Sequence, residues 1–142
     1  MNKLFLFGII SSLLIFSCKK DLRTKVYPLR AYNNSGVTGQ VSFIETKAKD
    51  TTIVKLEAHG LKVNTVYLTH LHTGKPGNLT GTLIYFTDIQ TSNGNVERDE
   101  SWNESFDDAL NSNTSFTVHD PAFFSNDTIG YVLAGNTGIN AR

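Results

Sequence analysis

Two histidines separated by one residue, His70 and His72, are the side chains of this chain best suited to holding a metal ion. They end a strand-like run that begins at Thr65, and side chains two apart on a strand project to the same face, roughly 6.5–7 Å apart. A third histidine, His119, ends another strand-like run that begins at Ser115. Imidazole is a ligand for zinc, copper, iron and nickel. We therefore predict that His70, His72 and His119 form a site for copper or zinc.

Three protein ligands leave an open coordination position, which is typical of catalytic or exchangeable sites, whereas structural zinc sites are closed with four. Asp120 follows the third histidine and is a candidate fourth ligand, or a hydrogen-bond acceptor that fixes a histidine tautomer. The remaining histidine, His59, stands beside Gly60 in a connection, where an exposed polar role is expected. The alternative for the whole set is that the histidines only hydrogen-bond strand ends and loops.

The strand that carries the histidine pair also predicts where the pair lies. His70 and His72 have the same parity as Val66 and Leu68, so we expect them on the core-facing side of the strand. The pair is then expected at the point where that face reaches the end of the fold. There an ion is held by rigid strands and is still reachable from solvent.

Strand-like runs bounded by turn residues occur at 37–45, 51–58, 65–72, 82–89 and 115–119. In the second run Val54, Leu56 and Ala58 share one face. No amphipathic helical stretch separates the runs. This pattern predicts an all-β fold, an antiparallel Greek-key-like β-sandwich.

The segment 88–108 is rich in acidic residues, and we expect it to form a solvent-facing loop that ends in one helical turn near 105–110. The only tryptophan, Trp102, is predicted to pin this loop onto the body of the domain. No Asp-x-Asp-x-Asp-Gly spacing is present, so a calcium loop is not expected.

The N-terminus predicts export and lipid anchoring. Residues 1–17 read as a signal peptide, with Lys3 before an apolar stretch, and the end of that stretch resembles a bacterial lipobox. Cys18, the only cysteine, is then the lipidated residue that anchors the protein to a membrane. We predict a tether over 18–30 and a β-sandwich domain over 31–142. The expected location is the cell envelope, on the inner or outer membrane, exposed to the periplasm or the cell surface.

Composition and missing motifs narrow the function classes. Thirteen Lys and Arg residues balance thirteen Asp and Glu, and a net charge of zero argues against a nucleic-acid partner. The chain has no Gly-x-Ser-x-Gly elbow, no P-loop and no cysteine nucleophile once Cys18 is acylated. A binding role is therefore favoured over a catalytic one, with the protein or small-molecule partner left open.

Four segments carry a family resemblance: Gly36–Phe43, the His70–His72 motif with the Gly/Pro loop after it, Phe116–His119 and Gly135–Asn140. Together they resemble the CHRD domain, a module of bacterial exported proteins, over roughly residues 35–141. The ending is similar to that of Bacteroidetes-type lipoproteins. The resemblance implies a β-sandwich with a role in the cell envelope.

The same order of motifs is more distantly similar to the Cu/Zn superoxide dismutase sandwich, and by that resemblance His70, His72 and His119 match three copper ligands. The chain departs from that family because no histidine lies between His72 and His119. It also has Asn140 where dismutases place an anion-steering arginine. Three hypotheses follow: a binding module with a copper or zinc site, a structural or interaction module without metal, and a dismutase-like redox enzyme.

Overall fold

The computed structural model describes residues 21–123 and 130–142. The predicted signal peptide, Cys18 and the first part of the tether lie outside these residues. The strands are β1 Thr24–Ala31, β2 Thr38–Glu45, β3 Thr52–His59, β4 Val66–Lys75, β5 Asn78–Tyr85, β6 Ile89–Gln90, β7 Asn95–Trp102, β8 Asn113–His119 and β9 Tyr131–Gly138. Helix α1 spans Phe106–Asn111, and two short 3-10 turns, η1 and η2, span Pro121–Phe123 and Ile139–Ala141. Among the described residues, no helix has the length and apolar character needed to cross a membrane.

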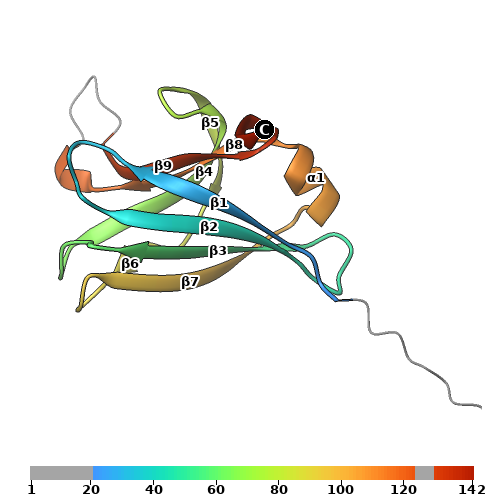
Figure 1. Ribbon diagram of the computed structural model, residues 1–142, viewed down its shortest axis with the longest axis horizontal. Coiled ribbons are helices and arrows are strands. Elements are labelled where there is room, and N and C mark those ends of the chain that lie inside the picture. Colours follow the sequence, from blue (N-terminus) through green and yellow to red (C-terminus); the bar gives the residue numbers. More distant parts are fainter. Residues whose placement is uncertain (1–20, 124–129) are drawn as a thin grey trace, which may run out of the picture.

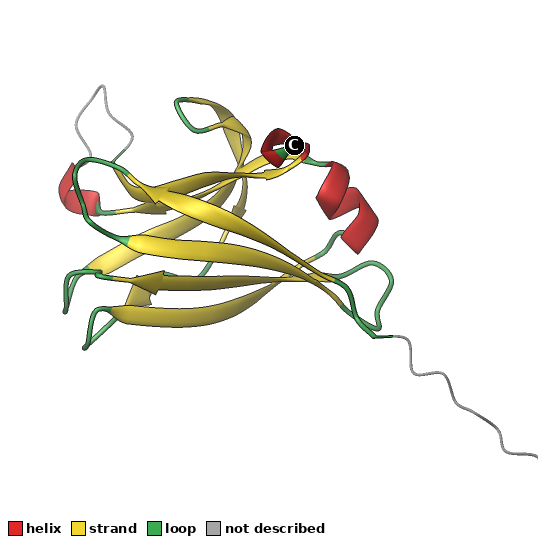
Figure 2. Cartoon of the chain, in the orientation of Figure 1, coloured by secondary structure: helices red, strands yellow, loops and turns green. Residues whose placement is uncertain are grey.

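The strands form one curled sheet in the order β5-β4-β8-β9-β1-β2-β3-β7, with β6 paired to β4, and every pairing is antiparallel (Figures 1 and 2). The predicted all-β antiparallel fold is confirmed. Strand β1 joins the two halves, because it pairs with β2 along most of its length and with β9 only at Arg30 and Ala31. The finer assignment to a two-sheet Greek-key sandwich stays a prediction.

The core lies inside the curl, where inward-facing side chains of both halves meet. In β3 the buried residues alternate as predicted, with Val54, Leu56 and Ala58 all 3 % exposed or less. Phe43 on β2 is fully buried and packs edge-on against Trp102, with ring centroids 5.6 Å apart. Trp102 therefore pins its segment to the domain, as predicted.

Two segments differ from the sequence-based expectations. The predicted tether extends to residue 30, but the structure places 24–31 in the sheet as β1, with Tyr27 and Leu29 buried. Tyr27 and Leu29 are the only two buried positions of β1, and basic residues stand near them in the sequence. The alternation is therefore too short to predict a strand. Likewise, 95–102 is not a loop but the edge strand β7, whose charged side chains face solvent on a strand paired to β3. The predicted helical turn is confirmed as α1, which Ser105 caps by accepting from the Asp108 backbone amide.

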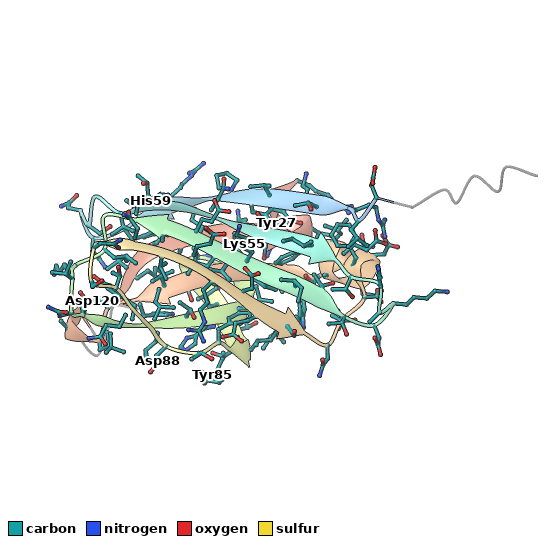
Figure 3. All side chains as sticks on the ribbon, turned by 90° about the horizontal axis from the view of Figure 1, so that it is seen from below. Tyr27, Lys55, His59, Tyr85, Asp88 and Asp120 are labelled. Carbon is teal, nitrogen blue, oxygen red and sulfur yellow. The ribbon has the colours of Figure 1, made fainter. Side chains whose placement is uncertain are left out.

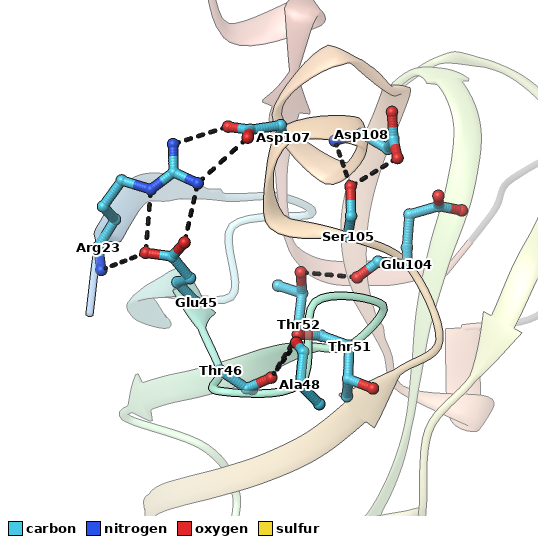
Figure 4. Close-up of polar contacts among 10 residues, drawn as sticks. All are labelled: Arg23, Glu45, Thr46, Ala48, Thr51, Thr52, Glu104, Ser105, Asp107 and Asp108. Carbon is cyan, nitrogen blue, oxygen red and sulfur yellow. Dashed lines mark hydrogen bonds and ion pairs between the residues drawn. The ribbon is translucent and has the colours of Figure 1, made fainter. Parts of the chain in front are cut away.

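Arg23 fixes the start of β1 against the rest of the domain. Its guanidinium donates to both carboxylate oxygens of Glu45 at 3.0 Å and to Asp107 at 2.7 Å, which joins β1, the end of β2 and α1 (Figure 4). These two carboxylates raise the pKa of Arg23. Arg23 therefore ties the start of β1 to the end of β2 and to α1.

Candidate metal centre

The histidine pair lies on the outer face of β4, opposite to the face predicted. Tyr67, Thr69 and Leu71 point into the core and are 2 % exposed or less, so residues of the other parity face outward. The expectation that His70 and His72 share the core face was wrong. Both faces of β4 carry apolar side chains, and Val66, which shares the parity of the histidines, is exposed.

Pairing between β4 and β8 brings the third histidine to the same face. Leu68 lies opposite His119 and His70 opposite Thr117, and residues opposite one another in an antiparallel pair share a face. The pairing of β4 with β5 shifts register beside His72, and the pairing of β8 with β9 shifts register at His119. Bulges of this kind re-aim side chains and recur next to functional sites.

The three predicted histidines form one cluster. Their ligand nitrogens all lie within 4.8 Å of one another, and this set could hold a metal ion. Ring centroids are 4.9 Å apart for His70 and His119, 5.3 Å for His70 and His72, and 5.7 Å for His72 and His119. Nitrogens bound to a common ion at about 2.0–2.1 Å sit roughly 3.3 Å apart in a tetrahedral site, so the nitrogens must approach one another by up to about 1.5 Å. His70 is the least buried of the three and has the most room to move.

A backbone carbonyl selects the tautomer of His72. Its Nδ1 lies 3.1 Å from the Gly81 carbonyl oxygen on β5, and a carbonyl can only accept, so Nδ1 carries the proton. The opposite nitrogen, Nε2, then presents a lone pair. Nε2 is buried and has no hydrogen-bond partner among the described residues. A buried lone pair without a partner is costly unless something binds it.

His119 is oriented in the same manner by Thr117, two residues earlier on the same face. The Thr117 hydroxyl donates to the His70 carbonyl at 3.4 Å and lies 2.8 Å from His119 Nε2. When the hydroxyl donates to that carbonyl, Nε2 donates to the hydroxyl, and the buried Nδ1 carries the lone pair that would coordinate an ion. Such partners fix ring orientation and raise ligand basicity in metal sites.

Burial keeps all three imidazoles neutral, the form that binds metal. Burial lowers the pKa of His119 to about 3, and repulsion from the other two rings adds to the effect. The pKa of His70 is lowered by burial and by His72, with Asp88 acting in the opposite sense. Burial also lowers the pKa of His72, partly offset by its bond to Gly81. At neutral pH an incoming ion therefore does not compete with protons.

Acid should destabilise the metal-free protein. Above pH ~6.5 His119 is neutral in both the folded and the unfolded state; below it, only the unfolded state takes up the proton readily. The free energy of unfolding should therefore decrease as the pH is lowered, by up to about 1.4 kcal/mol per pH unit between roughly pH 6.5 and pH 3. Urea titrations in EDTA should show a shallower fall for His119→Gln, whose amide can still bond Thr117. Equal slopes in the two proteins would contradict this assignment.

The other two candidate residues, His59 and Asp120, lie outside the histidine cluster. His59 bonds Asn95 through Nδ1 at 3.0 Å. Figure 3 shows His59 on the other side of the molecule from Tyr85, whose ring packs edge-on against His70 with centroids 4.6 Å apart. Asp120 is not among the residues that gather. Instead it is buried, accepts from the Ala122 amide at 2.9 Å and lies 3.7 Å from the Lys62 ammonium.

Sequence reasoning missed the residues that surround the rings. Gly81 and Tyr85 come from β5, whose predicted range begins four residues too late. Tyr131 of β9 packs edge-on against His119, with ring centroids 5.3 Å apart. These contacts depend on strand pairing that one sequence does not reveal. The contact of Thr117 with His119 could have been predicted from the sequence, because residues two apart on one strand share a face.

Comparison with known protein families and with curated proteins found no match for this sequence. The arrangement of the three histidines therefore carries the functional argument by itself.

Proposed function

We propose that this protein binds one copper or zinc ion through His70, His72 and His119 and serves as an exported metal-binding protein. The observation that carries the proposal is the convergence of three imidazoles whose ring nitrogens lie within 4.8 Å. The Gly81 carbonyl selects the His72 tautomer whose Nε2 carries the lone pair, and the Thr117 hydroxyl orients the ring of His119. Two of the three rings are held by protein contacts before any ion arrives.

The donor set favours these two metals. Neutral imidazoles suit both, and for a site of given nitrogen ligands Cu(II) binds more tightly than Zn(II). With three protein ligands one position is left for water or an exchangeable group. An ion held in this way can be passed on, which suits a binding or delivery role.

The test is the metal content of the full-length protein. Metal-free protein is loaded with Cu(II) or Zn(II), desalted and assayed by mass spectrometry of its metals; about one ion per chain is expected, as for a single mononuclear site. His72→Gln should retain little metal. His59→Gln is the matched control, because it removes a histidine outside the cluster, and it should bind as the wild type does. Equal metal in His72→Gln and wild type, or none in the wild type, would refute the proposal.

We further propose that the protein is held at the cell envelope by acylation of Cys18. The support is the sequence pattern around that cysteine, which lies outside the described residues. Since β1 begins at Thr24, only five residues separate the proposed anchor from Thr24. The tether is therefore shorter than predicted, and the domain would sit close to the lipid surface.

A further inference from the structure

A hollow lies outside the histidine cluster and is lined by residues of the β4–β5 turn, β9, the end of β1 and the C-terminal turn. Figure 1 shows these segments beside one another. Its volume is about 430 Å³, which is in the range of small-molecule sites. The polar side chains that line it are Arg30, Tyr32, Lys75, Asn136, Asn140 and Arg142. Ala134 and Gly135 form part of its wall.

The hollow is positively charged. Arg30, Lys75 and Arg142 come from three separate elements, and no acidic side chain of the described residues lines the hollow. Among the same residues, neither Arg30 nor Lys75 forms an ion pair, whereas Arg23 and Lys55 elsewhere on the surface each contact two carboxylates. Cations gathered in a concave site without counter-charges attract an anion.

The groups around the hollow are held in place. The Asn140 side-chain amide donates to the carbonyls of Gly74 at 2.9 Å and Thr114 at 3.0 Å, which ties the C-terminal turn to β4 and β8. The Arg142 guanidinium donates to Asn111 at 3.0 Å. The Tyr32 ring packs edge-on against Tyr131, with centroids 5.3 Å apart. These contacts fix part of the wall of the hollow before a ligand binds, whereas Arg30 and Lys75 are exposed side chains at its edge.

We propose that this hollow binds a sugar-sized organic anion, a sugar phosphate or a sugar acid. Arg30 offers a planar fork that matches a phosphate or carboxylate, and Lys75 adds a second positive charge. Asn136 can hydrogen-bond sugar hydroxyls, and Tyr32 offers an aromatic ring edge or face to the sugar ring. The proposal is independent of the metal site, whose ligands do not line the hollow.

Calorimetric titration of the full-length, EDTA-treated protein tests this proposal, because EDTA removes any bound metal that could itself hold phosphate. The probes are glucose 6-phosphate, glucuronate, glucose and inorganic phosphate. One of the two sugar anions should bind, and the double variant Arg30→Gln/Lys75→Gln should bind it at least tenfold more weakly. The matched control Lys47→Gln/Lys49→Gln removes two exposed charges from the β2–β3 turn and should bind as the wild type does.

Four results would overturn the proposal. The first three are no binding of either sugar anion to the wild type, equal binding by Arg30→Gln/Lys75→Gln, and glucose bound as tightly as the sugar anion that binds. The fourth is inorganic phosphate bound as tightly as both sugar anions, since the sugar would then contribute nothing. Each result leaves the metal content of the protein unaffected, so failure here is distinct from failure of the metal proposal.

Discussion

Addition of Cu(II) or Zn(II) to the metal-free protein is expected to raise its melting temperature by roughly 10 °C. A ligand that binds only the folded state stabilises it by about 2.7 kcal/mol when present at 100 times its dissociation constant. For a domain of this size that free energy corresponds to a shift of roughly this amount. Differential scanning calorimetry of metal-free protein titrated with each ion measures it.

The histidine variants decide whether the shift arises at the proposed site. His72→Gln should abolish most of it, and His59→Gln should leave it intact, because His59 contacts Asn95 outside the cluster. A shift that survives in His72→Gln would place the ion elsewhere. Ion binding to histidines of the unfolded chain would only reduce the shift.

Leu71→Ala should destabilise the protein by about 2–5 kcal/mol, the cost of removing a fully buried leucine side chain. Its neighbour in sequence, His70, points to the opposite face of β4 and is half-buried. His70→Ala should therefore cost much less, about 1 kcal/mol or below. Urea unfolding of the two variants in EDTA compares them directly.

This pair of variants tests the face assignment of β4. If the histidines shared the core face, as the sequence pattern suggested, His70→Ala would be the more damaging substitution and Leu71→Ala the milder one. The reversed order of the two unfolding free energies would contradict the described orientation of the strand.

Some elements were predictable because one face of the strand is apolar and the other polar. In β3, Val54 and Leu56 alternate with Lys55 and Glu57, and this pattern predicts both the strand and its buried face. In β4 apolar residues occupy both faces, so parity does not decide which side is buried. Strand β7 was missed because it is an edge strand covered with charged residues, which reads as a loop.

The candidate site was predictable in its residues but not in its surroundings. The spacing of His70 and His72 requires a shared face, and a strand ending in His119 can pair alongside. The register that joins β4 to β8, and the carbonyl of Gly81 that orients His72, follow from pairing across the sheet. That information is spread over the chain and is not contained in any local motif.

The separation of the two faces of β4 has a consequence for how a metal ion would be bound and released. The packing that holds the curled sheet together involves Tyr67 and Leu71, while an ion would sit on the reverse side of the same strand. On the proposed function, the ion would enter and leave on that side by rotation of imidazole rings, without disturbing the core packing. The metal-free protein would then stay folded between one ion and the next.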